Sequence, residues 1–421
     1  MQYPYFTNID TSLIRSGGGR DPLSLLPVWS SYGRNLVPNL ASPVTQVNGI
    51  IAVLFIHWLY EKPLEKFFSD GDKSFRQYFR IMEGLLEYFL WNASPSHDGY
   101  CFGTRALSAE VEDFRVTAVD VRTAVNGLYQ YYRGTCRRAN LLDSDWSVPA
   151  EVSNSFSGCW DEKATNILVN ILTPPLANSK VAISPSAIFN QNPNFDGRVK
   201  AVFHSQQIRA LLQQQLLGEA RHVAFAGKCA ILNAQKVDYT KEGWSNWCLG
   251  QLKNWMQEDD CSAKDLLNHV VQAQKCEPFL LLMQDCFDFM LASPGEKLPG
   301  ISAKLQGYAS HIRQRASGFL ALTSSNHADR MLQMLSLAEI AQSDISLFLR
   351  SILNHHHKCM MERGRDPMVF IDEDKIIVPS PSDRDGNSIL KRLESGLPWI
   401  NGYYLWNAGE IYRQLYGVQH G

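Results

Sequence analysis

The longest apolar stretch of the chain runs from Gly49 to Tyr60 and reads GIIAVLFIHWLY. A helix needs about 20 consecutive apolar residues to span the core of a bilayer, so this stretch is too short to cross a membrane. A helix that is apolar on every side must instead be covered by other parts of the protein. The stretch therefore predicts a buried core helix that ends near Tyr60, before Pro63, and we expect no membrane partner.

Apolar residues recur at helical spacing over most of the chain. Between Lys73 and Asn92 they return every three or four positions, which is the period of one helix face. The N-terminal residues 1–45 are interpreted as loops and short helical turns, because prolines punctuate them. A helix break is predicted at Pro278, and Asn326 is predicted to cap a long helix that reaches Glu362. Helices are predicted over residues 117–132, 205–217, 263–273, 278–291, 301–322 and 326–362.

The pattern changes after Asp366-Pro367. Two short β-branched runs, Met368–Ile371 and Lys375–Val378, flank the acidic triplet 372–374, which predicts a β-hairpin. A final helix is expected near residues 407–415. The predicted fold class is therefore mainly α, a multi-helix globular protein whose C-terminal segment contains a small β-hairpin.

Residues 173–204 are rich in proline and asparagine, which is typical of a long loop or a linker. They divide the chain into an N-terminal helical domain over 1–172 and a second helical domain over 205–364. The last part, 365–421, is predicted to hold the hairpin and the C-terminal helix packed on the helical body.

The charge balance excludes several classes of protein. The chain has 421 residues, with 40 Lys and Arg against 42 Asp and Glu, a net charge of −2. This composition is too apolar for a disordered protein and has no net positive field for coating nucleic acid. The nine cysteines include no C-x-x-C pair, so we expect reduced thiols in a cytoplasmic protein. The first residues have neither a basic nor an apolar region, so we expect no signal peptide. No cofactor is predicted.

Two groups of arginines are candidates for binding an anion or a nucleic acid. Arg15 and Arg20 bracket three glycines, a pattern that can form an anion-binding nest. Arg133, Arg137 and Arg138 follow a tyrosine-rich stretch, and arginines mixed with aromatic residues can contact phosphates and bases. The alternatives are a flexible loop for the first group and a helix C-terminus for the second.

Two further patterns are candidates for metal or catalytic chemistry. His355 and Cys359 are four residues apart on a predicted helix, a spacing that metal sites use. Asp366, Glu373 and Lys375 resemble the carboxylates and lysine of metal-dependent nucleases and phosphoesterases, in which carboxylates hold Mg²⁺. The alternatives are a polar helix end and an exposed acidic hairpin turn, and both are favoured over a site.

The stretch Arg20–Trp29 (RDPLSLLPVW), with Leu36–Leu40 (LVPNL) and the apolar segment Ile50–Tyr60, is similar to the opening of uncharacterised bacterial proteins encoded near anti-phage defence and restriction genes. Their pattern has an R-D-P-L-G-L-like start, a turn with leucine and proline, and an apolar helix that ends in Trp. Here Ser24 replaces the glycine. The resemblance covers this N-terminal stretch alone and carries over no catalytic residue. It implies a cytoplasmic prokaryotic accessory subunit that works beside ATPases or nucleases on foreign DNA.

The leading hypothesis is a non-enzymatic helical adaptor or scaffold in a bacterial multi-protein complex for anti-phage defence. Helical content, many aromatic residues, low charge and the lack of a clear catalytic motif all favour it. Protein partners are expected, with DNA reached through the complex. The alternatives are a metal-dependent nuclease or phosphoesterase in the C-terminal segment and a nucleic-acid-binding accessory protein.

Overall fold

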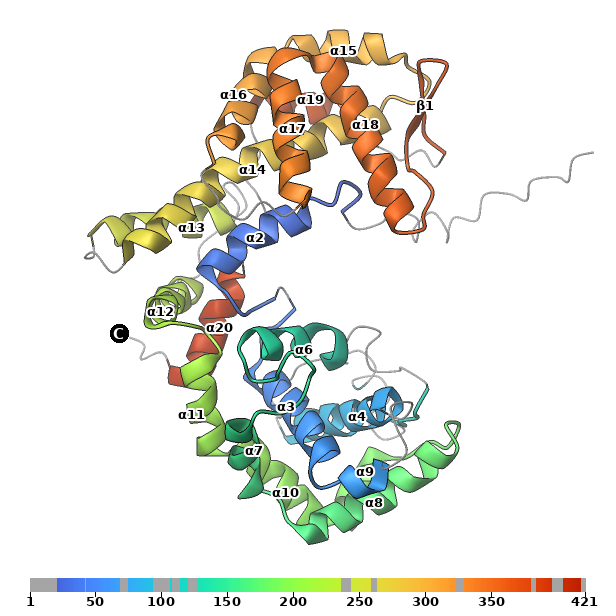
Figure 1. Cartoon of the computed structure of the whole chain (residues 1–421), viewed down its shortest axis with the longest axis vertical. Helices are drawn as coiled ribbons and strands as arrows, with labels where there is room; N and C mark the ends of the chain where they lie inside the picture. The colour runs from blue at the N-terminus through green and yellow to red at the C-terminus, as the bar shows by residue number, and fades with distance from the viewer. Residues whose placement is uncertain are drawn as a thin grey trace, which may run out of the picture. The chain divides into compact units, whose positions relative to one another are not determined.

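The computed structural model describes residues 21–41, 43–68, 75–93, 107, 114–119, 127–235, 244–258, 263–322, 329–379, 384–395 and 404–417. In these ranges α-helices dominate, and the sole sheet is a two-stranded antiparallel hairpin (Figure 1). The predicted fold class is confirmed. No helix within the described ranges combines the length and the apolar character that crossing a membrane requires.

The described residues form two compact units, and each unit joins segments that are distant in the sequence. Unit 1 contains residues 21–36 and 244–395, and unit 2 contains residues 37–235 and 404–417. These units differ from the predicted domains. Residues 173–204, predicted as a linker, lie inside unit 2 and are largely helical. Pro185 and Pro193 occupy first turns of helices, where no N–H is needed, and Pro174 and Pro175 lie in the last turns of α8.

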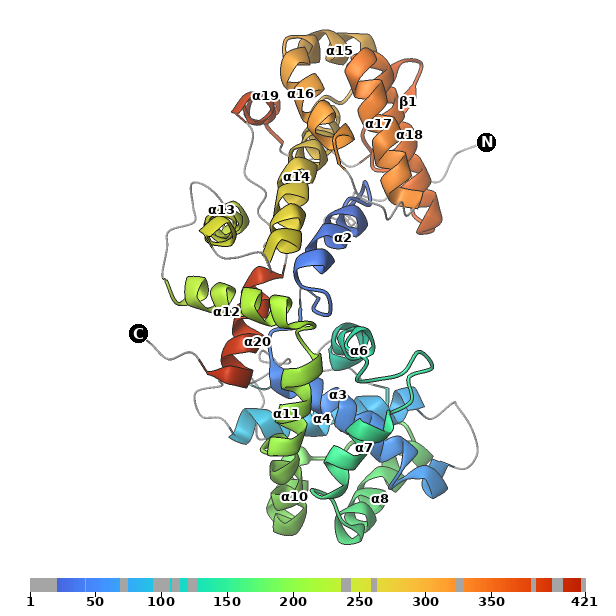
Figure 2. The same cartoon turned by 60° about the vertical axis from the view of Figure 1, so that its left-hand side comes forward.

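Unit 1 is built around the long helix α14, which packs against α2, α13, α16, α18 and α19. Figures 1 and 2 both show α17 and α18 side by side in this unit. Its elements are α2 (Leu26–Leu36), α13 (Trp244–Glu258), α14 (Lys264–Leu291), α15 (Leu298–Gln306), α16 (Ala309–Leu320), α17 (Asp329–Ser343), α18 (Ile345–Glu362), β1 (Phe370–Asp372), β2 (Lys375–Ile377) and α19 (Gly386–Ser395).

Four predictions in this unit were wrong. The single helix predicted over 301–322 is two helices, α15 and α16, separated at residues 307–308. Residues 26–36 form a regular helix rather than loops. The break predicted at Pro278 is absent, because α14 continues through it with buried side chains on both sides of the proline. The single helix predicted over 326–362 is two helices, since the Asp344 carboxylate accepts a hydrogen bond from the Leu347 N–H at 3.0 Å and begins α18. The predicted cap Asn326 lies outside the described residues.

The predicted hairpin is confirmed. Phe370 pairs with Ile377 and Asp372 with Lys375, which leaves Glu373 and Asp374 as a two-residue turn. Both turn residues have positive φ angles, 43° and 66°, as a type I′ turn requires.

Unit 2 is built around α3, the helix predicted from the apolar stretch. It packs against α4, α6, α7, α10 and α20, which bury it on all sides. Its elements are α3 (Val47–Glu61), the 3-10 helix η1 (Glu65–Phe68), α4 (Phe75–Ala93), α6 (Leu128–Arg138), α7 (Ala150–Ser157), α8 (Glu162–Ala177), α9 (Pro185–Gln191), α10 (Pro193–Phe203), α11 (Gln206–Gln215), α12 (Ala220–Ala234) and α20 (Leu405–Tyr416).

Aromatic side chains fill the core around α3. The Phe55 ring lies 5.7 Å from Phe156 of α7 and 5.1 Å from Trp160, which precedes α8. Trp160 in turn lies 5.7 Å from Phe195 of α10. Because these four rings come from different segments, they stabilise the contacts between α3, α7, α10 and the start of α8.

Candidate functional site

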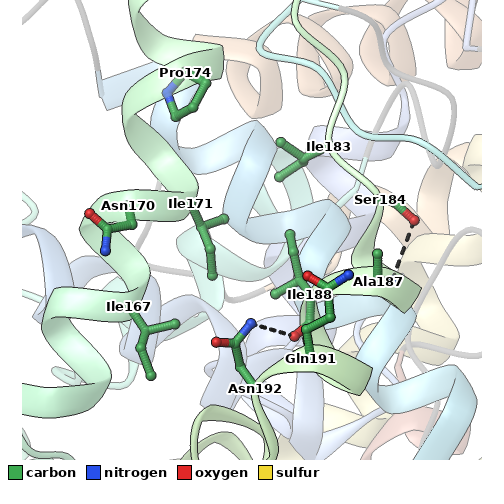
Figure 3. A pocket seen from close by; sticks show the side chains of 10 residues that line it. All are labelled: Ile167, Asn170, Ile171, Pro174, Ile183, Ser184, Ala187, Ile188, Gln191 and Asn192. Carbon is green, nitrogen blue, oxygen red and sulfur yellow. Dashed lines mark hydrogen bonds between the residues drawn. The ribbon is translucent and has the colours of Figure 1, made fainter.

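A groove lies between α8 and α9 in unit 2 (Figure 3). Its volume is about 340 Å³, near the lower end of the range typical of ligand pockets (~300–1,000 Å³). Helix α8 forms one wall, and α9 with the segment leading into it forms the other. The lining residues are Ile167, Asn170, Ile171, Pro174, Ile183, Ser184, Ala187, Ile188, Gln191 and Asn192.

The α8 wall follows from how that helix begins and packs. Asp161 caps it, because its carboxylate accepts a hydrogen bond from the Ala164 N–H at 2.8 Å. Leu168 and Leu172 are fully buried and fix one face of the helix on the core. Ile167 and Ile171, each one position earlier, lie on the groove side and are half-buried. The groove therefore exposes apolar area that the core does not use.

The second wall is held by contacts to other segments of unit 2. Ile183 forms an isolated antiparallel bridge with Val116, with N–H···O distances of 2.9 and 3.0 Å. Ser184 then caps α9 by accepting from the Ala187 N–H at 3.4 Å. Phe189 is buried, and its ring lies 5.4 Å from Phe89 of α4. The wall is thus preformed rather than a loop that must be ordered by a ligand.

The chemistry of the groove is apolar and uncharged. Four isoleucines, two on each wall, are half-buried around it (Figure 3). The amide side chains of Asn170 and Gln191 are exposed at the rim. None of the ten lining residues carries a formal charge. Such a surface favours an aliphatic, neutral segment and offers nothing to a phosphate backbone.

Arg133, predicted to contact an anion, is only 8% exposed. Its Nε donates to His57 Nε2 at 3.0 Å, and its guanidinium carbon lies 4.2 Å from the Tyr129 ring centroid and 4.1 Å from that of Trp146. Burial, together with the adjacent Arg133 charge, lowers the pKa of His57 to about 3, so its ring stays neutral and accepts the bond. Arg133 therefore ties α6 to the central helix α3.

The two arginines predicted beside it are oriented toward different partners. Arg137 is exposed and lies 4.5 Å from the Trp146 ring centroid. Arg138 Nε donates to the backbone carbonyl of Asn39 at 3.0 Å, and its Nη2 donates to Thr135 at 3.0 Å. Arg133 and Arg137 both lie against the Trp146 ring, but Arg133 is buried and Arg138 bonds to Asn39 and Thr135, so only Arg137 of the three is exposed. Arg15 and Arg20 lie outside the described residues.

His355 and Cys359 are close, with Nε2 and Sγ 3.4 Å apart, but both are buried. His355 Nε2 lies 2.8 Å from the carbonyl oxygen of Leu23, so this nitrogen carries a proton and donates it. Arg330 donates to the Cys359 sulfur at 3.2 Å. The pair therefore anchors the segment before α2.

His356, the next residue of α18, anchors the same segment. Its Nδ1 donates to the Pro22 carbonyl at 3.0 Å, and its Nε2 accepts from the Met368 N–H at 2.9 Å. Burial lowers the pKa of both His355 and His356. We call these two side chains the histidine lock.

The candidate nuclease residues Asp366, Glu373 and Lys375 are all exposed. Glu373 is in the hairpin turn, and Lys375 is opposite Asp372 in the ladder. Within the described ranges no three His, Cys, Asp or Glu side chains are grouped so that they could hold a metal ion. The arrangement matches the acidic-turn interpretation of this segment.

Sequence reasoning missed the groove, although one signal pointed to it. Ile167 and Ile171 are spaced like one helix face and each follows an exposed asparagine, Asn166 or Asn170. That pattern marks isoleucines at the edge of the buried face.

Comparison of the chain with protein-family models, curated proteins and solved structures finds no match.

Proposed function

We propose that this chain is a non-enzymatic helical adaptor that binds a segment of a partner protein in the α8–α9 groove. The observation that carries the proposal is a preformed, uncharged groove with four half-buried isoleucines. Apolar surface of this kind on a folded scaffold favours protein contacts. The N-terminal resemblance adds the context of a bacterial complex for anti-phage defence.

The experiment compares two matched variants of the full chain at native expression level. Ile171→Asp places a charge in the groove wall, whereas Ile231→Asp places the same charge at a 48% exposed isoleucine of α12 in the same unit. Co-purified proteins are quantified against the wild type by isotope labelling. Each variant is also checked for an unchanged unfolding temperature, because Ile171 is half-buried.

We expect one or more co-purified proteins to be lost from the Ile171→Asp sample and retained in the Ile231→Asp sample. The purified partner should then bind the wild type directly and the Ile171→Asp protein at least about tenfold more weakly, the effect of a charge against an apolar segment. Equal recovery of every protein with both variants contradicts the proposal.

A further inference from the structure

Arginine and aromatic side chains alternate in a row that links α4, α6 and the turn after α6 in unit 2. The guanidinium carbon of Arg76 on α4 lies 3.7 Å from the ring centroid of Tyr129. Arg133 contacts both Tyr129 and Trp146, at 4.2 and 4.1 Å from their ring centroids. Arg137 lies 4.5 Å from the Trp146 centroid. We call these five side chains the arginine row; it starts at Arg76 and ends at Arg137.

The two end arginines keep hydrogen-bond donors free. Stacking on a ring holds a guanidinium in place without using its N–H groups, which point outward in the plane of the group. Nη1 of Arg76 is shielded from solvent and has no acceptor. Arg137 makes no side-chain hydrogen bond to any residue that the structure describes. Because a cationic donor without an acceptor is unfavourable, these groups favour binding of an anion.

The positive charge of the row is not balanced by ion pairs. Elsewhere in unit 2, Arg198 pairs with Asp161 at 2.6 Å and Arg413 pairs with Glu410 at 2.9 Å. In the described ranges, no arginine of the row forms such a pair, and neither does Arg80, one turn after Arg76 on α4. Four arginines of one region therefore lack a paired carboxylate.

Acidic side chains close to these arginines are engaged elsewhere. The Glu83 carboxylate of α4 accepts a hydrogen bond from the Leu128 N–H in the first turn of α6. Burial raises the pKa of Glu83 to about 7, so this group carries only part of a negative charge at neutral pH. Asp143 and Asp145 both accept from the Ser147 hydroxyl, at 3.3 and 2.7 Å. The region therefore keeps an excess of positive charge.

We infer that the arginine row, together with Arg80, binds the phosphate groups of an extended polyanion of the kind that a nucleic-acid strand presents. Arg76 and Arg80 are half-buried and Arg137 is exposed, so solvent reaches both ends of the row. Tyr129 and Arg137 are eight residues apart on α6, about 12 Å along the helix, so one phosphate group cannot contact both ends.

The rings of the row act as supports for the arginines. Tyr129 and Trp146 each contact two guanidinium groups, which leaves charge rather than base stacking as the means of recognition. Binding should therefore be independent of base sequence, as contacts to phosphates are. This inference does not rest on the α8–α9 groove.

The first test measures the fluorescence anisotropy of a labelled oligothymidine of about 12 nucleotides mixed with the full chain. The salt concentration is varied from about 50 to 200 mM. Three phosphate contacts, one each for Arg76, Arg80 and Arg137, predict that the logarithm of the affinity falls with that of the salt concentration with a slope of about −2. No binding at the lowest salt concentration, or an affinity that salt does not change, would overturn the inference.

The second test removes one positive charge at a time. Arg76→Gln and Arg137→Gln should each weaken binding about tenfold and make the salt slope shallower by about 0.7. Arg413→Gln removes the same charge from α20 in unit 2 and should leave the affinity unchanged. The unfolding temperature of each variant is measured, and Arg80→Gln replaces Arg76→Gln if the latter does not fold. Equal affinities of Arg137→Gln and Arg413→Gln, or a loss at only one end of the row, contradict a single extended ligand.

Competition identifies the source of the phosphates. Unlabelled oligothymidine should displace the probe, and displacement by inorganic polyphosphate at the same phosphate concentration shows that backbone charge is sufficient. Failure of polyphosphate assigns the site to a nucleic-acid strand. Displacement by inorganic monophosphate at that concentration would overturn the inference, because one phosphate cannot contact both ends. The groove variant Ile171→Asp should bind the probe like the wild type, so this result is separate from the adaptor proposal.

Discussion

Gly409 lies where helix α20 crosses α12, and replacing it with alanine should force the two helices apart. A Cβ at position 409 would lie 2.8 Å from the Cys229 carbonyl carbon and 2.9 Å from the Ala230 nitrogen, closer than real Cβ contacts come. Both atoms belong to the backbone of α12, so no side-chain rotation relieves the overlap. The same Cβ would displace the Asn233 amide, which donates to the Trp406 carbonyl at 2.9 Å.

The expected magnitude comes from comparison with Gly197, which lies in the middle of α10 and would place its Cβ in open space. Alanine improves helix propensity by about 1 kcal/mol at either position, so this gain cancels in the comparison. Overpacking costs about 1–3 kcal/mol, and loss of the Asn233 hydrogen bond adds about 1 kcal/mol. Gly409→Ala should therefore be roughly 2–4 kcal/mol less stable than Gly197→Ala.

The assay is urea unfolding of the full chain, followed by circular dichroism, for the wild type and both variants. Gly197→Ala should unfold at a higher urea concentration than the wild type and Gly409→Ala at a lower one. If Gly409→Ala is as stable as Gly197→Ala, the close approach of α12 and α20 does not hold in solution, and the reasoning is refuted.

Three further predictions concern side chains described above. The histidine lock should weaken in acid, because burial lowers the pKa of His355 and His356 below the ordinary 6.5. The stability that these neutral side chains add is therefore complete above pH 6.5 and is lost as the pH falls through their folded-state pKa values. An unfolding temperature that stays constant from pH 7.5 to 5 would contradict this prediction. Arg133→Ala should lower the free energy of unfolding in urea by about 2–4 kcal/mol, because it leaves a cavity and an unpaired His57. Arg137→Ala, on the exposed surface, should change the free energy of unfolding by no more than about 0.5 kcal/mol. Similar losses for the two variants would contradict the difference in burial. Asp344→Ala should lower the free energy of unfolding by about 1 kcal/mol, because α18 loses its N-cap. Asp344→Asn should keep most of that stability, because asparagine also caps helices, and thermal unfolding of both variants tests the difference.

Local patterns predicted the elements that depend on neighbouring residues. The apolar stretch at Gly49–Tyr60 became α3, the spacing at 73–92 became α4, and the short β-branched runs beside Glu373 became the hairpin. In α4 the period of the apolar side chains decides which face is buried, whereas in α3 the unbroken apolar run requires burial on every side; both patterns are visible in the sequence.

Breaks between helices were less predictable, because packing overrides local signals. Pro278 lacks a donor, yet α14 continues through it, since the surrounding side chains are buried against several helices. Asp344, which looked like a polar position in one long helix, instead caps α18. Whether a proline or an aspartate ends a helix depends on the free energy of the contacts around it.

The contacts that form the candidate site depended on tertiary structure. Local sequence patterns were enough to predict a mainly helical protein with a buried apolar helix and a C-terminal hairpin, because those features follow from spacings of a few residues. It could not determine that Val116 pairs with Ile183 to set one wall of the groove, or that Arg133 donates to His57. Those partners are far apart in the chain, and only folding, which buries their side chains together, brings them into contact.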